Sequence, residues 1–468
     1  MEKVRRRALG LASCLLLACA PSSPSRPRAV EAVEAAPPDA KHAVAASMST
    51  PEPAPPREAQ ASSQLDPDGN DDPEDAGEGA LPTQGRFEKV GAPPLALTRI
   101  CDLTALGDAL YLAHANQPLG TDGATITRYR PSDPACPFTV AFDWNRPGEP
   151  TKGGGAGQGF LRVRNIGGRL FVPDADPPYA GLGLVDPGAE GYVFRSDDAG
   201  VFARAQGAHF RPPKTAGVLP RAYHVIDVVR FRGAMLASTG SVPPKERAWQ
   251  GPSPGALHRA NDALSRWTYE ADYPRPWNDR VTRLTFLVRF RDRLYAGIQD
   301  YDGRDPNDYV HFTPDATAPS LGDAHPVRVV GSANTVRWWV DTVASPHRLY
   351  WLAFGRAGMS LRVTVDGDAW TAVRLPDGAG RPVDVTRFRD GVVVLTERGL
   401  HRLDAETGTF VTSTLATIAD KRSPFEVTDG FCVAPLAVFQ GSLYAGGQRG
   451  GALYRLVDAG PADGVASR

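Results

Sequence analysis

The segment Leu284–Gly297 reads LTFLVRFRDRLYAG and has the pattern of two short strands joined by a tight turn. An apolar-rich run ends at Phe290, the polar residues Arg291-Asp292-Arg293 form the expected turn, and a second apolar run begins at Leu294. A single hairpin of this kind cannot bury both of its faces. Copies of it along a chain therefore predict stacked or radially arranged units that share a core.

The same hairpin pattern occurs seven times in this chain, each time as a short polar turn between two apolar runs. The copies lie at Leu106–Tyr111, Ile166–Phe171, Phe231–Leu236, Phe290–Tyr295, Ser345–Tyr350, Phe388–Val393 and Phe439–Tyr444. Successive copies are 43 to 65 residues apart, near or somewhat above the period of propeller blades. A third and a fourth strand follow the hairpin in most units. The sequence therefore predicts an all-β, seven-bladed β-propeller of four-stranded antiparallel blades.

The turns between the third and fourth strands show a second pattern. Residues 196–202 and 260–267, with a shorter relative at 364–370, resemble degenerate Asp-boxes of sialidase-type propellers. Each differs from the family pattern in spacing or in residue type. The resemblance therefore implies the blade but not the sialidase activity, whose arginine triad, tyrosine nucleophile and paired carboxylate have no assignable positions here.

The seventh unit lacks a fourth strand, because only a short polar tail follows Val457. An unpaired edge strand is open to association with other chains, so something must cover it. Residues 86–90 form a lone alternating strand ahead of the first unit. We expect this strand to close the ring by completing the seventh unit, with Phe87 as the start of the fold.

The N-terminus has the features of an export signal. Basic residues precede the apolar run Ala8–Ala18, which is too short to span a bilayer. Residues 16–19, LLAC, end this run and resemble the lipobox of bacterial lipoproteins, which implies cleavage before Cys19 and lipidation of that residue. Ala20, where the family's inner-membrane retention signal would have Asp, implies an outer-membrane address in a double-membrane bacterium. An ordinary secretory signal is the alternative.

Composition divides the chain into four predicted parts. No aromatic residue occurs between Ala20 and Gly85, where Pro, Ala, Ser, Glu and Asp dominate, so this stretch cannot form a core. We expect a lipoprotein signal peptide at residues 1–18, a disordered tether at 19–84, the propeller at 85–460 and a disordered tail at 461–468. The tether would hold the propeller near the membrane through the N-terminal lipid.

The cysteine pattern agrees with export. The expected propeller contains Cys101, Cys136 and Cys432, an odd number that allows one bridge among them. Cys101 and Cys432 lie near the starts of first strands in the first and seventh units, which ring closure would make neighbours. We therefore expect a disulfide between these two residues rather than one that involves Cys136.

The sequence gives little support for a metal site or for nucleic-acid binding. The histidines are scattered and show no ligand spacing typical of a metal site. Asp300, Asp302 and Asp305 could place oxygen atoms around calcium, although a polar turn is the favoured interpretation. The net charge of −1 and the lack of a basic block argue against a nucleic-acid partner.

Loop length predicts where a site would lie. In the first four units, long connections lead away from the face opposite the tight turns: Asn145–Gly159, Pro173–Glu190, Gly207–Arg221, Val242–Pro254, Asp272–Arg280 and Gln299–Asn307. Long loops in a compact domain tend to carry function. We expect Asp227, Arg283 and Asp341, with Trp338 or Trp339, at the loop-rich mouth of a central channel. Alternatively, the carboxylates bond neighbouring blade backbones and the tryptophans pack between blades.

Two functions are compatible with these features. The favoured one is a non-catalytic binding or scaffolding lipoprotein that presents its loop-rich face to an envelope glycan, peptide or protein. The alternative is an extracytoplasmic glycoside hydrolase or lyase, which rests on fold analogy alone.

Overall fold

The structure, a computed structural model, describes the chain from residue 76 to residue 459 with gaps. The described residues are 76–115, 124–144, 159–175, 190–203, 214–220, 222–241, 255–273, 282–300, 303–314, 321–404, 409–418, 422–428 and 430–459. All regular elements in these ranges are β-strands. No helix there is long and apolar enough to cross a membrane. The predicted signal peptide, Cys19 and the predicted tail lie outside the described residues.

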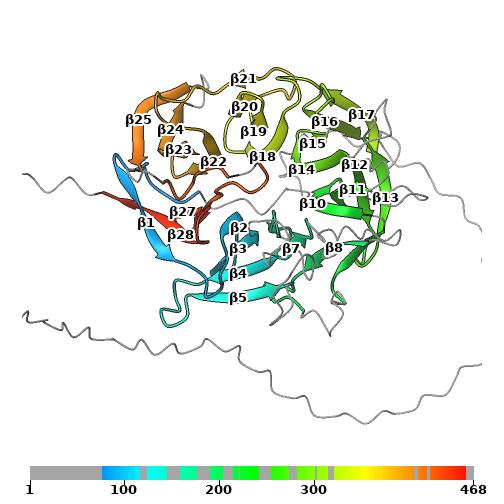
Figure 1. The fold of residues 1–468 in the computed structure, drawn as a ribbon, viewed down its shortest axis with the longest axis horizontal. Coiled ribbons are helices and arrows are strands. Elements are labelled where there is room, and N and C mark those ends of the chain that lie inside the picture. Colours follow the sequence, from blue (N-terminus) through cyan, green and yellow to red (C-terminus); the bar gives the residue numbers. More distant parts are fainter. Residues whose placement is uncertain are drawn as a thin grey trace, which may run out of the picture. The chain divides into compact units, whose positions relative to one another are not determined.

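Five sheets have four strands each, in chain order, with neighbouring strands antiparallel (Figure 1). The first three are β2 (Arg99–Leu106), β3 (Ala109–Ala115), β4 (Thr125–Tyr129) and β5 (Phe138–Asp143); β6 (Arg164–Asn165), β7 (Leu170–Pro173), β8 (Glu190–Arg195) and β9 (Gly217–Pro220); and β10 (Ala222–Phe231), β11 (Ala234–Ser241), β12 (Gly255–Ala260) and β13 (Trp267–Asp272). The next two are β14 (Thr282–Phe290), β15 (Arg293–Asp300), β16 (Tyr309–Pro314) and β17 (Leu321–Val327); and β18 (Asn334–Asp341), β19 (Arg348–Gly355), β20 (Gly358–Thr364) and β21 (Thr371–Ala372).

The remaining eight strands form one sheet. Its order is β22 (Pro382–Phe388), β23 (Gly391–Thr396), β24 (Gly399–Asp404), β25 (Thr409–Thr417), β1 (Gly85–Gly91), β28 (Leu453–Asp458), β27 (Ser442–Gly446) and β26 (Leu436–Phe439). The end strands β22 and β26 contact each other, so this sheet nearly closes on itself. The fold is thus a propeller of four-stranded antiparallel blades in which five blades are separate.

The prediction of seven separate blades is wrong for this last sheet. β1 pairs with β25 in parallel at one position, Gly85 with Ala416, and this pair joins two four-stranded halves. A Cβ at residue 85 would lie 2.9 Å from the Leu456 side chain, so glycine permits this close approach of three strands. The extra pairing is a tertiary contact that hairpin spacing does not reveal.

The strand that precedes the first unit does complete the last one, as predicted. β1 runs antiparallel to β28, with Phe87 opposite Leu456, and the Phe87 ring lies 5.1 Å from the ring of Phe425. The pairing begins at Gly85, two residues before the predicted start. Residues of the predicted tether also contact the propeller, because the Leu81 amide donates a 2.8 Å hydrogen bond to Asp390 Oδ1.

The tight turns set the hairpin register. In the turns Phe231–Ala234 and Phe439–Ser442, both central residues have positive φ angles between 49° and 78°. This is the two-residue hairpin geometry that matches the twist of antiparallel strands. In the hairpin of residues 284–297, β15 starts at Arg293, so the turn is one residue shorter than predicted.

Apolar side chains pack mainly between neighbouring sheets. Val229 of β10 and Leu287 of β14 belong to one buried cluster, and Phe142 of β5 shares another with Phe194 of β8. Such shared clusters explain why no hairpin could be stable alone. The strands that face the centre, here called the inner strands, are β2, β6, β10, β14, β18, β22 and β26. They contact one another in series from β10 through β14, β18, β22, β26 and β2 to β6, and β10 also contacts β7.

Candidate functional site

β-Bulges set the side chains that face the centre of the ring. Five inner strands have a register shift, which in β14 precedes Leu287. In the other four, a charged residue follows the shift directly, namely Asp102, Asp227, Arg337 and Asp384. A bulge bends its strand and re-aims the next side chain. The four bulges therefore bring charged groups from β2, β10, β18 and β22 to equivalent positions.

Arginines from the second sheet join this arrangement. Arg162 lies four residues before Ile166, which ends its inner segment. Asp102 has the same position in its own strand, four residues before Leu106. Arg164 follows two residues later in β6. Together these side chains form what we call the channel layer: Asp102, Arg162, Arg164, Asp227, Arg337 and Asp384.

Asp227 ties three neighbouring sheets together. Its side chain is fully buried and accepts a bidentate pair of hydrogen bonds from Arg164, Nε to Oδ1 at 2.9 Å and Nη2 to Oδ2 at 2.6 Å. Its Oδ2 also accepts the Leu287 amide of β14 at 2.8 Å. A buried carboxylate with a bidentate guanidinium and backbone donors is well compensated for its loss of water.

Asp102 and Asp384 repeat this role at other interfaces. Asp102 accepts the Val163 amide at 3.0 Å and Asp384 accepts the Leu436 amide at 2.7 Å, each from the next inner segment along the ring. Arg337 connects the two carboxylates, with Nη1 3.1 Å from Asp102 Oδ1 and Nε 3.3 Å from Asp384 Oδ1. The channel layer is therefore an ionic network that spans the ring.

Burial and pairing act on these groups in opposite directions. Burial opposes ionisation of Asp102, but the positive charges of Arg162 and Arg337 outweigh it and hold the pKa of Asp102 below its usual value. At Asp384 burial prevails and raises the pKa despite Arg337. Burial, followed by repulsion from Arg337, lowers the pKa of Arg162 to about 10.

A cavity of about 360 Å³ lies next to the channel layer. Asp102, Arg162 and Arg337 border one end of it, and Gly107 and Gln440 of the tight turns border the other. This cavity extends toward the tight turns rather than toward the loop-rich face that we predicted. Most residues of the long connections lie outside the described part of the chain.

The predicted carboxylates and Arg283 lie in interfaces between sheets and do not border this cavity. Asp341 forms a bidentate pair with Arg387, at 3.1 Å to Nε and 2.6 Å to Nη2, and accepts the Val343 amide. Arg283 of β14 contacts the ring of His224 in β10. With Asp227, these residues support the structural alternative that the sequence left open.

The two tryptophans border the cavity from β18 but differ in burial. Trp338 is buried, donates its indole N–H to the Phe286 carbonyl at 3.0 Å, and packs on Tyr309 and Trp351. Trp339 is half-buried, with its ring 5.1 Å from that of Tyr350. Trp338 therefore packs between sheets as in the alternative interpretation, whereas Trp339 is available to the cavity.

Sequence reasoning missed the charged residues that border the cavity, namely Asp102, Arg162, Arg164, Arg337 and Asp384. One signal was present. Asp102, Asp227 and Asp384 all stand four residues before the end of an inner strand, at Leu106, Phe231 and Phe388. Arg162 and Arg337 stand at the same distance before Ile166 and Asp341, whereas Arg164 has no such position.

The acidic loop considered for calcium is bonded internally. Asp300 Oδ2 accepts the amides of Arg304 and Asp305, both at 2.9 Å, and Asp305 Oδ2 accepts the Tyr273 hydroxyl at 2.6 Å. Asp302 lies outside the described residues. In the part of the chain that the structure describes, no group of three or more His, Cys, Asp or Glu side chains is placed to hold a metal ion.

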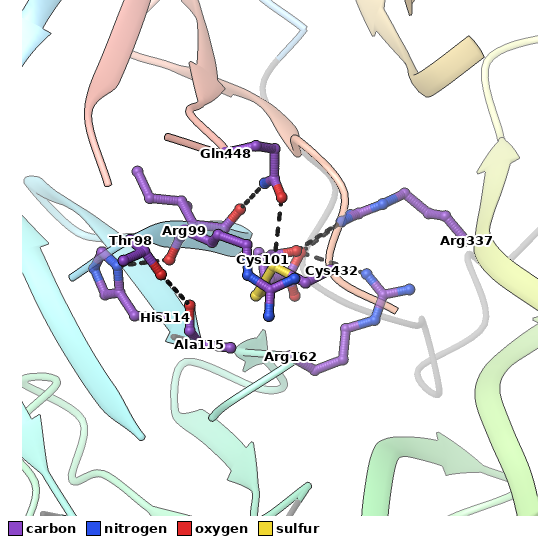
Figure 2. The surroundings of a disulfide bond; sticks show 11 residues. Thr98, Arg99, Cys101, His114, Ala115, Arg162, Arg337, Cys432 and Gln448 are labelled. Carbon is purple, nitrogen blue, oxygen red and sulfur yellow. Dashed lines mark hydrogen bonds and ion pairs between the residues drawn. A yellow bond between two sulfur atoms is a disulfide. The ribbon is translucent and has the colours of Figure 1, made fainter. Parts of the chain in front are cut away.

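A disulfide lies beside the channel layer. Cys101 and Cys432 form the predicted bridge, with an S–S distance of 2.06 Å and a Cα–Cα distance of 4.6 Å. Figure 2 shows the guanidinium groups of Arg162 and Arg337 pointing toward it, and Arg337 Nη2 donates to the Cys101 carbonyl at 3.1 Å. The bridge thus joins the first and last inner segments where the ionic network meets them.

Replacement of Asp227 by Ala should destabilise the protein strongly, because the partly buried Arg164 would lose its carboxylate partner. Loss of one partner of a buried pair costs about 3–5 kcal/mol. Urea unfolding measures the difference. The matched control is Asp198→Ala, which removes an exposed carboxylate paired with Arg169 and should change little. Equal effects of the two substitutions would contradict the structural role of Asp227.

His114 should make the protein less stable in acid. It is buried and neutral, with Nδ1–H donating to the Arg99 carbonyl at 3.1 Å and Nε2 2.7 Å from the Thr127 hydroxyl, and burial lowers its pKa to about 3 (Figure 2). The unfolded chain takes up this proton below pH 6.5, so stability falls from there toward pH 3. The loss at pH 5 is about 2 kcal/mol. Urea midpoints at pH 7 and pH 5 should differ less for His114→Gln than for the wild type, and an identical difference would refute the assignment.

Comparison with known proteins adds little beyond the fold. No family model matches the sequence, and no curated protein matches it. Among solved structures, the chain is similar to a streptogramin B lyase, at 10% identity and a TM-score of 0.48 over 81% of this chain and 99% of that one. It is also similar to virginiamycin B lyase from Staphylococcus aureus, at 9% identity and a TM-score of 0.46 over 80% of this chain and 99% of that one. PorZ, a surface component of the type-IX secretion system of Porphyromonas gingivalis, matches at 15% identity and a TM-score of 0.45 over 78% of this chain and 47% of that one. Likeness at this level supports no inference about activity.

Proposed function

We propose that this chain is an exported, lipid-anchored protein of the cell envelope whose propeller binds a ligand or partner without transforming it. The observation that carries this proposal is the pairing within the channel layer. A general acid or base must reach its substrate with a proton to give or accept. The carboxylates Asp102, Asp227 and Asp384 instead accept hydrogen bonds from neighbouring inner segments and from arginines.

We also propose how many blades act in the ring and what the loop-rich face does. The eight-stranded sheet acts as two blades, because its four-stranded halves meet at one residue pair, so the ring has seven functional units. The long connections of the first four units provide a contact surface for an envelope glycan, peptide or protein. Loops held by a rigid scaffold commonly serve in this way.

Binding and turnover can be measured side by side. The complete mature chain, solubilised in detergent, would be titrated against panels of envelope glycans and peptides by calorimetry, and each mixture would then be analysed by mass spectrometry. We expect saturable binding of at least one ligand with no change in its mass. Release of a cleaved or rearranged product would support the hydrolase or lyase instead. Failure to bind any ligand of either panel would count against the proposal.

The proposed lipid anchor depends on Cys19, which follows the apolar run at the start of the predicted tether. A lipid on this residue would keep the propeller at the membrane, whereas the apolar run itself would be removed with the signal. In cells grown with labelled palmitate, the wild-type protein should carry the label and the Cys19→Ala variant should not. Equal labelling of both proteins would exclude lipidation at this residue.

A further inference from the structure

Two arginines of the channel layer have N–H groups without a hydrogen-bond acceptor. A guanidinium has five N–H groups. Within the described residues, Arg162 donates one hydrogen bond, a long one of 3.4 Å from Nη1 to Asp102 Oδ1, and its Nε has no hydrogen-bond partner. The closest approach of that Nε to a carboxylate is 3.8 Å, to Asp227 Oδ2. Yet the Arg162 side chain is only 4% exposed.

Arg337 has the same shortage on the other side of Asp102. Its Nε has no hydrogen bond, although Asp384 Oδ1 lies 3.3 Å away. Both guanidinium groups depend on Asp102, and the charge of Arg337 is one cause of the lowered pKa of Arg162. Arg162 and Arg337 both border the cavity and have few acceptors within the described chain, so this end of the cavity favours a ligand that brings negatively charged acceptor atoms.

The orientation of Arg162 suits such a ligand. Its guanidinium carbon lies 4.5 Å from the centre of the Phe286 ring, so one planar face is covered by an aromatic side chain. A guanidinium that is held flat loses little freedom when it binds a carboxylate through two parallel hydrogen bonds. The carboxylates of the layer offer Arg162 no such pair of bonds. Asp102 accepts one long hydrogen bond from it and also binds Val163 and Arg337, and Asp227 is bound by Arg164 and Leu287.

The remaining walls of the cavity offer groups that suit hydroxyls. Thr104, Thr386 and Gln440 border it, together with the half-buried Trp339. A cavity of about 360 Å³ is at the small end of the range for organic ligands. A compact acid that carries several hydroxyl groups fits this combination of charge, polarity and size.

We propose that the channel cavity binds a small hydroxylated carboxylate, such as a monomeric sugar acid, with its carboxylate on Arg162 and Arg337 and its hydroxyls toward Thr104 and Gln440. This inference rests on the proposed binding function and names the ligand class of the cavity. It places the small-molecule site at the tight-turn end of the ring, away from the loop-rich face.

Calorimetric titration of the complete mature chain tests this assignment with three matched probes, galacturonate, its methyl ester and galactose. The probes share a sugar ring, but only galacturonate has a negative charge. Charged hydrogen bonds to two arginines should make galacturonate bind at least about tenfold more tightly than the other two. Equal affinity for the ester, or no binding of galacturonate to the wild type, would overturn the inference.

Two variants locate the binding, and a third controls for the exchange of arginine by lysine. Thr104→Met fills the cavity without removing a charged group, and Arg162→Lys keeps the charge but loses the planar fork. Each should weaken galacturonate binding at least about tenfold. Arg130→Lys makes the same exchange at a partly exposed arginine paired with Asp108 and should bind as the wild type does.

The outcomes separate this inference from the proposed function. If Arg162→Lys fails to fold, Thr104→Met decides the location, and unchanged affinity in that variant refutes the cavity. Binding of an envelope glycan or peptide that Thr104→Met leaves unaltered, without galacturonate binding, would keep the proposed function and discard the channel ligand. Absence of binding in both sets of titrations would discard both.

Discussion

Deletion of residues 20–91 should abolish cooperative unfolding, whereas deletion of residues 20–75 should leave the melting temperature nearly unchanged. The longer deletion removes β1, which pairs with β28 from Gly85 to Gly91 and packs Phe87 against Phe425. Phe87 is partly buried, so loss of its side chain costs less than the about 3–5 kcal/mol that is typical of a core Phe. The strand's hydrogen bonds would be lost as well, so the total approaches the 5–15 kcal/mol that is typical of a whole folded domain.

Circular dichroism and calorimetric melting curves measure this difference. A third deletion, residues 20–84, removes the contact of Leu81 with Asp390 but keeps β1. It should lower the melting temperature modestly, since an exposed hydrogen bond contributes little. If the deletions that end at residues 75 and 91 melt alike, β1 does not close the ring in solution.

Replacement of both Cys101 and Cys432 by Ser should lower the free energy of unfolding by about 4–5 kcal/mol. The bridge joins residues 331 positions apart, and a cross-link that closes so long a loop removes much of the conformational freedom of the unfolded chain. Both cysteines are buried, which protects the bridge from solvent reductants in the folded state. The effect should appear in urea midpoints measured under oxidising conditions.

The matched control is the same comparison after unfolding and refolding in a thiol reductant. The difference between wild type and double variant should then vanish, because neither protein has the bridge. A difference that persists in reductant would mean that the serine hydroxyls disturb packing and that the bridge itself contributes little.

These two predictions concern two independent connections between the chain's ends. The disulfide joins the start of β2 to the segment before β26 near the centre of the ring, and β1 joins β28 farther out. Neither connection shares a residue with the other. Each connection therefore contributes to stability separately from the other.

Local features of the chain were enough to predict much of the architecture. Turn residues between apolar runs, as at Phe231–Ala234, report hairpins because backbone preference and strand periodicity are short-range properties. The last unit lacks a fourth strand, and an unpaired strand edge favours pairing with another strand, so the pairing of Phe87 with this unit could be predicted. The positions of Cys101 and Cys432 then predicted their bridge once closure was assumed.

Only the tertiary structure decided the candidate site. Arg337 meets Asp102 across 235 positions of sequence, and the β-bulges that aim both side chains inward leave no mark in composition or periodicity. The same limit explains the joined sheet at Gly85 and Ala416. Sequence reasoning chose Asp227 and Asp341 as site residues, but partly buried arginines engage them, because the free energy of burying a carboxylate favours a partner wherever packing supplies one.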